Sequence, residues 1–321
     1  MLSFLISFVS PSFATTVGFA LGPELLQPYP DTHPYQFPDA AIAVTAAANG
    51  SRLMFWSDGL TYRVEGAGFF PANAPSPPTP VLGSGSKGSY DANGNWFLAV
   101  FPLDESRLVA FTHVENHGWD CPGPYAEWNA GAVVSSVDGG VTWAREGLAV
   151  ADPQPCAPAF GGLGYSSVLY KDGAYLAFGG CTGFISSHPE GAPGSWWRFR
   201  GGWFSSPGVN GSSDCLPGVP ANACCPIVHY NSFFDEFVMV YTTWGRNDTL
   251  FIATSPDGVH WGPSQILLEA TAGRAIAYGQ VLGAHNNSVA GQEAVLAYAA
   301  APPVGGHPRD FVYRAITFSR P

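Results

Sequence analysis

Residues Ser136–Trp143, SVDGGVTW, form the pattern that best indicates how this chain folds. They fit Ser-x-Asp-x-Gly-x-x-Trp, the pattern known as an Asp box. Asp138 can accept hydrogen bonds from backbone N–H groups of its own turn, and Gly139 and Gly140 can adopt the positive φ of a tight corner. Trp143 would bury its ring beside that corner. The pattern therefore predicts a hairpin corner between two β-strands.

Similar corners recur along the chain. Ser255–Trp261, SPDGVHW, is one residue shorter, and Ser57–Tyr62, SDGLTY, is a weaker copy. Asp257 follows Asp138 by 119 residues, which is close to twice a repeat of about 60 residues. Short runs of β-branched and aromatic residues between turn signals fall into five groups. We therefore predict an all-β chain folded as a five-bladed β-propeller with Asp-box hairpins, and a pair of β-sandwiches is the alternative.

The composition agrees with many short strands and limits the partners. The chain has 321 residues, of which 39 are Gly and 29 are Pro, so turns are frequent and helices are disfavoured. The formal net charge is −11, only Lys87 and Lys171 are lysines, and no basic run exists. Nucleic acid and an anionic membrane surface are therefore not expected as partners. We expect a monomer.

The first residues suggest export from the cell. A short apolar run, Leu2–Val9, precedes Ser12-Phe13-Ala14, which resembles a small-x-small cleavage site. We predict a signal peptide over 1–14, an extended segment over 15–38 and the propeller over 39–321, in a secreted protein. The run is too short to span a membrane. Four glycosylation sequons support secretion: Asn49, Asn210, Asn247 and Asn286.

The chain contains six cysteines. An even number in a secreted chain indicates disulfide bonds. We expect Cys215 to pair with Cys224 or Cys225, and Cys121 to pair with Cys156. No CxxC pair or His/Cys cluster indicates a zinc site, so no cofactor is expected.

The stretch Arg107–Asp120, RLVAFTHVENHGWD, contains three polar side chains at alternate positions. If the strand continues through it, His113, Glu115 and His117 lie on one face. These groups could bind a metal ion, or Glu115 could act as an acid or base tuned by its neighbours. A solvated strand end is the third interpretation. If the chain holds an ion, we expect a structural cation at the propeller axis.

Other residues could complete a carbohydrate site. Glycoside hydrolysis uses two carboxyl groups, and Asp39 and Asp91 each precede an expected inner strand, where they could equally be turn residues. His229 lies on an expected inner strand, where it either packs in the core or faces the channel. Aromatic side chains suit sugar rings, and the candidate stacking residues are Trp119, Trp128 and Trp244.

The order of several segments resembles a known family. SYDANGNWFLAVF, RLVAFTHVENH, SSVDGGVTW, PIVHYNSFFDEFVMVY and IATSPDGVHW resemble five-bladed propeller glycoside hydrolases of family 43, the arabinanase and xylosidase clan. The resemblance covers about Asp39 to Trp261. It implies that Glu115 and His229 match a His-x-Glu and a Pro-x-Val-His segment, and that Asp39 stands where a blade-one Asp acts as general base.

Two segments depart from that family. Relatives often have Gly-Asp where this chain has Gly164-Tyr165, and Phe-x-Glu-Pro-Gly where it has FSSPG, Phe204–Gly208. If those acids are catalytic in relatives, this chain has lost turnover and kept sugar binding.

We predict a secreted glycoside hydrolase that acts on a polysaccharide or oligosaccharide by acid/base hydrolysis of a glycosidic bond. Glu115 would be the general acid, Asp39 or Asp91 the base, and His113 and His229 orienting groups. The alternatives are a carbohydrate-binding propeller without catalysis, and a metal-binding propeller that uses His113, Glu115 and His117.

Overall fold

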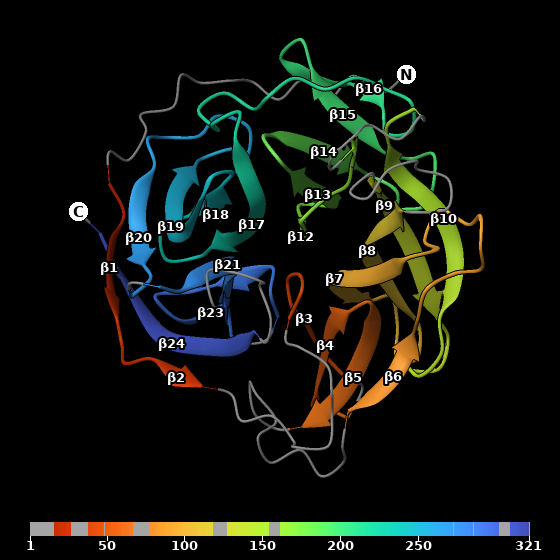
Figure 1. Cartoon of the computed structure of the whole chain (residues 1–321), viewed down its shortest axis with the longest axis horizontal. Helices are drawn as coiled ribbons and strands as arrows, with labels where there is room; N and C mark the ends of the chain where they lie inside the picture. The colour runs from red at the N-terminus through yellow and green to blue at the C-terminus, as the bar shows by residue number, and fades with distance from the viewer. Residues whose placement is uncertain are drawn as a thin grey trace.

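The computed structural model describes residues 16–26, 38–47, 49–66, 78–117, 127–153, 161–271, 273–284, 286–301 and 309–320. Their strands form five sheets around a central axis (Figure 1). Within these ranges the regular elements are all strands, and no helix is long and apolar enough to cross a bilayer. The predicted all-β, five-bladed propeller is therefore confirmed. The predicted signal peptide, 1–14, lies outside the described residues.

Three blades are continuous in sequence, and their strands run from the axis to the rim in chain order, except for one short strand in blade 2 (Figure 1). Blade 1 contains β3 (Ala43–Ala46), β4 (Arg52–Asp58), β5 (Leu60–Gly66) and β6 (Thr79–Leu82). Blade 2 contains β7 (Gly94–Pro102), β8 (Leu108–His117), β9 (Glu127–Ser136) and β10 (Ala144–Ala151), with β11 (Gly161–Leu163) parallel to β9. Blade 3 contains β12 (Ser167–Lys171), β13 (Ala174–Gly179), β14 (Thr182–Ser186), β15 (Trp197–Arg200) and β16 (Trp203–Pro207).

The other two blades borrow strands from distant parts of the chain. Blade 4 contains β17 (Ala223–Asn231), β18 (Glu236–Thr243), β19 (Arg246–Ser255) and β20 (Gln265–Glu269), with β22 (Val289–Ala290) parallel to β17. Blade 5 contains β21 (Ala275–Leu282), β23 (Glu293–Ala301), β24 (Asp310–Ser319) and the N-terminal strand β1 (Gly18–Leu21), while β2 (Leu25–Leu26) also pairs with β24.

Strand β1 closes the ring of blades. Gly18 pairs with Ser319 and Leu21 with Ile316, so the first described strand is the rim strand of the last blade. The propeller thus begins before the boundary at Asp39 that the sequence suggested. The physical reason is that β24 would otherwise present an unpaired edge of backbone N–H and C=O groups. Val17 and Phe19 also pack on the core of blades 4 and 5.

Side chains that bond to backbone join neighbouring blades. The Gln280 amide donates to the Ile42 carbonyl at 2.9 Å and accepts from the Ile42 N–H at 2.8 Å, which joins blade 5 to blade 1. Ser57 Oγ accepts from the Phe97 N–H at 3.0 Å, and Ser167 Oγ accepts from the Val228 N–H at 3.1 Å. These bonds link blade 5 to blade 1, blade 1 to blade 2, and blade 3 to blade 4. The inner strands of the five blades are β3, β7, β12, β17 and β21 (Figure 1).

The Asp138 turn has the hydrogen bonds that the sequence predicts. Asp138 Oδ1 accepts from the N–H groups of Val141 at 3.1 Å and Thr142 at 2.9 Å. Gly139 and Gly140 have φ values of 71° and 85°. The Trp143 ring packs edge-on against Phe97 with 4.8 Å between centroids. The carboxylate is therefore engaged by its own hairpin corner.

The Asp257 turn is built in the same way. Its Oδ1 accepts from the Val259 and His260 N–H groups, both at 2.8 Å. Trp261 packs edge-on against Phe178 with 5.9 Å between centroids. Two of the three sequence copies thus form the same kind of corner, on β9 and β19.

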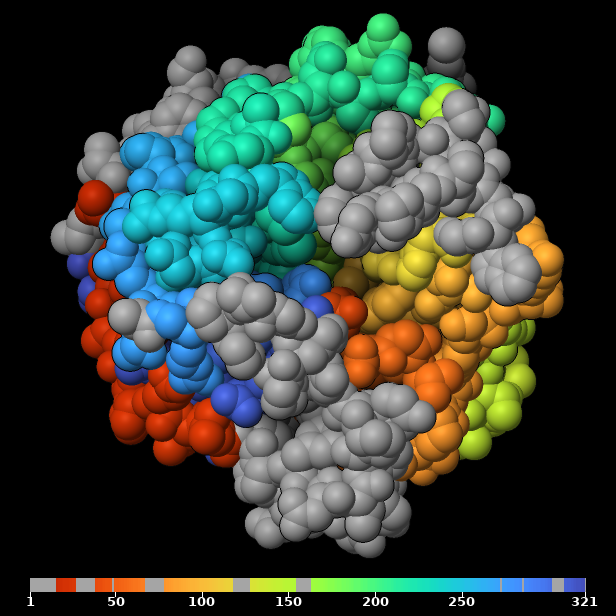
Figure 2. All heavy atoms as spheres, in the orientation of Figure 1, coloured from red at the N-terminus to blue at the C-terminus, as the bar shows by residue number. Residues whose placement is uncertain are grey.

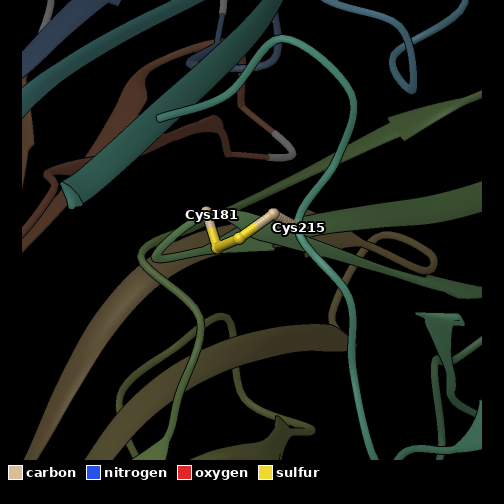
Figure 3. The surroundings of a disulfide bond; sticks show 2 residues. All are labelled: Cys181 and Cys215. Carbon is tan, nitrogen blue, oxygen red and sulfur yellow. A yellow bond between two sulfur atoms is a disulfide. The ribbon is translucent and has the colours of Figure 1, made fainter. Parts of the chain in front are cut away.

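One disulfide lies among the described residues, between Cys181 and Cys215 (Figure 3). The predicted pairing of Cys215 with Cys224 or Cys225 is wrong. The chain after β16 returns over blade 3, where the Leu216 N–H donates to the Cys181 carbonyl at 2.7 Å. That contact brings Cys215 to the β13–β14 turn. The predicted pair Cys121 and Cys156 lies outside the described residues.

Candidate active site

The candidate site lies at one end of the inner strands, where two of them bulge. Cys225 on β17 and Tyr278 on β21 have φ values of 55° and 56°, and each lies at a register shift of its strand. Such bulges re-aim side chains and are common beside active sites. Figure 2 shows a hollow near the middle of the molecule, between blades 1, 2 and 4.

Asp39 precedes β3 and is bound from blade 5. The Tyr278 hydroxyl donates to Asp39 Oδ1 at 3.1 Å, and the Arg309 guanidinium pairs with the same oxygen. Burial raises the pKa of Asp39, and the negative charge of Glu115 raises it further, against the opposing effects of Arg309 and Tyr278. Asp39 is therefore a carboxyl group that holds a proton more readily than usual, with another carboxylate nearby.

Glu115 is held between two histidines of its own strand. Its Oε1 lies 3.1 Å from His113 Nε2, and its Oε2 lies 3.1 Å from His117 Nε2. The prediction that these three side chains share one face of the strand is confirmed. Burial alone would raise the pKa of Glu115, but the hydrogen bonds and positive charges of His113 and His117 lower it to about 2. Glu115 is thus a permanent carboxylate at neutral pH.

The His113 side chain can occupy its position because Gly164, which has no side chain, faces it. A Cβ atom at Gly164 would lie 2.7 Å from His113 Nδ1 and 3.0 Å from the Ala130 carbonyl oxygen. The next residue, Tyr165, is fully buried, and its hydroxyl donates to the Ala132 carbonyl at 2.6 Å. The side chain that stands where the resembled family often has Asp therefore lies in the core between blades 2 and 3.

The two carboxyl groups at this end of the molecule have pKa values that are shifted in opposite directions. Asp39 is shifted upward and Glu115 downward. A pair of carboxyl groups with separated pKa values can hold one proton and one negative charge at the same pH. That combination is what acid/base chemistry on a single bond requires.

Asp91, the other candidate base, is fully buried among scaffold groups. Its Oδ2 pairs with Arg145 Nε at 2.6 Å and accepts from Asn95 Nδ2 at 3.2 Å. Its Oδ1 accepts from Ser89 Oγ at 2.8 Å. These bonds join the turn before β7 to the rim strand β10. None of these three partners is a residue that contacts Asp39.

His229 and Trp128 both lie in the core. His229 is only 1% exposed, and burial lowers the pKa of its imidazole to about 3. Its ring lies 6.3 Å from that of Phe318, and Nε2 has no hydrogen-bond partner among the described residues. Trp128 is 3% exposed and donates through Nε1 to the Asp152 carbonyl at 3.3 Å.

Of the two predicted stacking residues that the structure describes, Trp244 is the exposed one, at 58%. It lies in the turn between β18 and β19, and its N–H donates to the Asn222 carbonyl at 2.9 Å. Because Asn222 immediately precedes β17, Trp244 lies at the same end of blade 4 as Cys224. Trp119 lies outside the described residues.

Arg309, Tyr278 and Cys225 are not among the site residues predicted from the sequence. Tyr278 and Arg309 reach Asp39 across 239 and 270 residues of chain. The only local signal is polar or aromatic residues at the ends of expected inner and final strands. A positive φ at a Tyr or a Cys has no sequence signature, because L-residues of this size rarely adopt it.

Two further features bear on what the site could hold. Among the described residues, no group of three or more His, Cys, Asp or Glu side chains could hold a metal ion. A separate open pocket of about 520 Å³ lies between blades 1 and 2, lined by Ala46, Pro102 and Asp138 among others. Ala46 and Pro102 are at the far ends of β3 and β7 from Asp39 and Glu115, so this pocket is not part of the candidate site.

The fold is shared with known enzymes. No protein-family model and no curated protein sequence matches the chain. The Cellvibrio cellulosa α-L-arabinanase aligns with 86% of this chain and 91% of its own, at 8% identity and a TM-score of 0.53. The catalytic domain of the Coprinopsis cinerea GH62 α-L-arabinofuranosidase aligns with 94% of this chain and 98% of its own, at 12% identity and a TM-score of 0.50. The resemblance to five-bladed propeller glycoside hydrolases is therefore confirmed for the fold.

Proposed function

We propose that the protein is a glycoside hydrolase that cleaves a glycosidic bond at the Asp39–Glu115 site. The observation that carries the proposal is the pair of neighbouring carboxyl groups whose pKa values are shifted apart. Most glycosidases use two carboxyl groups that flank the scissile bond. The propeller fold shared with an arabinanase and an arabinofuranosidase supports the same class of reaction.

The two pKa shifts favour the reverse of the roles that the sequence suggested. Asp39, with its raised pKa, would donate the proton to the leaving oxygen. Glu115, with a pKa of about 2, would stay ionised and act as the base or stabilise positive charge on the sugar ring. Tyr278 and Arg309 would position Asp39, and His113 and His117 would position Glu115.

We further infer that the substrate is a polysaccharide or oligosaccharide outside the cell. Support for secretion comes from the disulfide Cys181–Cys215, because such bonds persist in oxidising compartments. Three of the sequon residues, Asn49, Asn210 and Asn247, are exposed, as a glycan attachment site requires. The names of the two structural neighbours suggest pentose polymers as the first substrates to test.

The test is release of reducing sugar from linear arabinan, arabinoxylan and starch. We expect wild-type protein to act on one of them, and Glu115→Gln to lower the rate about 100-fold or more. Glu190→Gln is the matched control, since Glu190 is a half-exposed carboxylate that contacts Arg107 at 3.3 Å. Equal rates in wild type and Glu115→Gln would remove Glu115 from the mechanism.

A carbohydrate-binding propeller without catalysis is the second candidate. The exposed Trp244 at the Cys224 end of blade 4 favours it, because an exposed indole can stack on a sugar ring without any acid or base. Binding of the same polysaccharides without release of reducing sugar, lost in Trp244→Ala, would favour this candidate over hydrolysis.

A further inference from the structure

Two adjacent cysteines at the start of β17 touch each other. In a regular strand, neighbouring side chains point to opposite faces, so their sulfur atoms cannot meet. Here Cys224 Sγ and Cys225 Sγ are 2.6 Å apart. The register shift between Cys224 and Ile227 and the left-handed backbone of Cys225 break the alternation and turn both side chains together.

The cysteine pair forms part of the candidate active site. The negative charge of Asp39 acts on the Cys225 thiol, and Cys225 in turn acts on Tyr278, so the three groups are neighbours. Both cysteines are half-buried rather than sealed in the core. Thr242, two residues before the exposed Trp244, donates to the Cys224 carbonyl at 3.4 Å. The cysteine pair is therefore close to Asp39 and lies at the same end of blade 4 as Trp244.

We propose that Cys224 and Cys225 form a disulfide with each other, and that this closed ring is the form of the site that binds carbohydrate. The second half of the proposal rests on the proposed function. Adjacent Cα atoms are about 3.8 Å apart, which is below the usual range of about 4.4–6.8 Å across a disulfide. Ring closure therefore needs a backbone that departs from the extended form, and Cys225 at φ 55° supplies it.

The bond forms by exchange with an external disulfide, either a small molecule or a protein. The Cys224 thiolate attacks one sulfur of the oxidant and releases the first oxidant thiol. The Cys225 thiolate then attacks Cys224 Sγ and releases the second, so the two cysteine protons and two electrons end on the two released thiols. Cys224 is the better attacking group, because its hydrogen bond with Cys225 lowers the pKa of Cys224 and raises that of Cys225.

Ring closure would change what the site presents to a sugar. Two thiols that share a hydrogen bond become one covalently fixed surface of low polarity without S–H donors. A fixed surface loses less conformational entropy when a ligand packs on it, so the oxidised form should bind more tightly. Because the Cα spacing of neighbours is unfavourable, the ring should also be easier to reduce than the bond between Cys181 and Cys215.

The bond itself is tested by peptide mass mapping of the full chain after thiols are blocked with N-ethylmaleimide. In protein kept in glutathione disulfide, we expect the peptide with Cys224 and Cys225 to be unlabelled and lighter by two hydrogen atoms. Rising concentrations of a phosphine reductant should open this pair before Cys181–Cys215. Maleimide on both Cys224 and Cys225 while Cys181–Cys215 is intact would overturn the proposal. As controls, Cys215→Ser should keep the ring, and Cys225→Ser should leave Cys224 labelled.

The role of the ring is tested by binding of linear arabino-oligosaccharides at a reductant concentration that opens only this pair. We expect a loss of affinity of about tenfold on reduction, recovered on reoxidation with glutathione disulfide and absent in Cys225→Ser. Equal affinity of the oxidised and reduced forms would overturn the role of the ring in binding. Whether the disulfide forms would still be decided by the peptide masses. No binding by either form would count against the proposed function and the role of the ring together.

Discussion

Asp39 and Asp91 are alike in sequence and in their first contacts, yet the molecule uses them differently. Each lies where a loop leads into an inner strand, and each pairs with an arginine, Arg309 for Asp39 and Arg145 for Asp91. The Asp91 side chain is fully buried, whereas that of Asp39 is 25% exposed. Asp91 is satisfied by Ser89, Asn95 and Arg145, while Asp39 lies near a second carboxylate, Glu115.

The difference shows what separates a structural acid from a candidate catalytic one in this fold. A carboxylate surrounded only by donors is stabilised as an ion and serves as a cross-link. Burial and a nearby negative charge raise the pKa of Asp39, whose side chain is still open enough to solvent to exchange a proton. The comparison therefore predicts that replacement by Asn will affect activity at Asp39 and stability at Asp91.

The largest expected effect is that of Asp39→Asn on hydrolysis. Loss of the proton donor should lower kcat by about 10²–10⁴-fold. The free energy of unfolding should change by less than about 1 kcal/mol, because burial already disfavours the charged form. Initial rates on the active polysaccharide and urea unfolding of the same preparation check both parts. A loss of unfolding free energy as large as that of Asp91→Asn, with kcat unchanged, would show that Asp39 is a structural residue.

Asp91→Asn should produce the opposite pattern. Removing the charge leaves Arg145 with the Gly83 carbonyl, to which its Nη2 donates at 2.7 Å, but without its carboxylate. We expect a loss of about 2–3 kcal/mol of unfolding free energy, reduced from the cost of a fully buried pair because Arg145 is one-third exposed. The activity per folded molecule should stay within about twofold of wild type. A fall of kcat without a loss of unfolding free energy would contradict the structural role of Asp91.

We assign His229 a structural role, as we do Asp91, and the pH dependence of the unfolding free energy tests that role. Burial lowers the pKa of its imidazole to about 3, below the unfolded value of about 6.5, so the unfolded chain binds more protons in between. The contribution of the buried imidazole to the free energy of unfolding is complete above pH 6.5. It falls by up to about 1.4 kcal/mol per pH unit as the pH drops below that value. His229→Leu should remove that slope between pH 6.5 and 5, as measured by urea unfolding. An unchanged slope, or a more than tenfold loss of hydrolysis, would contradict this assignment.

Local patterns predicted most of the fold and part of the site. Alternation in RLVAFTHVENH placed His113, Glu115 and His117 on one face, because strand geometry is set by neighbours in sequence. The pairing of Gly18 with Ser319, the contacts of Tyr278 and Arg309 with Asp39, and the disulfide Cys181–Cys215 join distant parts of the chain. Nothing local marks such contacts, and nothing local distinguishes the surroundings of Asp39 from those of Asp91.

The smallest expected effect is that of Asp138→Ala, which extends the comparison to an acid at the far end of the strands. The change removes the acceptor for the Val141 and Thr142 N–H groups in an exposed turn, so unfolding free energy should fall by on the order of 1 kcal/mol. Carbohydrate binding by the folded fraction should be unchanged, as should that of Asp257→Ala in the matching corner. Because Asp138 also lines the pocket between blades 1 and 2, lost binding at unchanged stability would move the carbohydrate site to that pocket. Intact binding would instead leave both turn acids as structural residues and the Asp39 end as the candidate site.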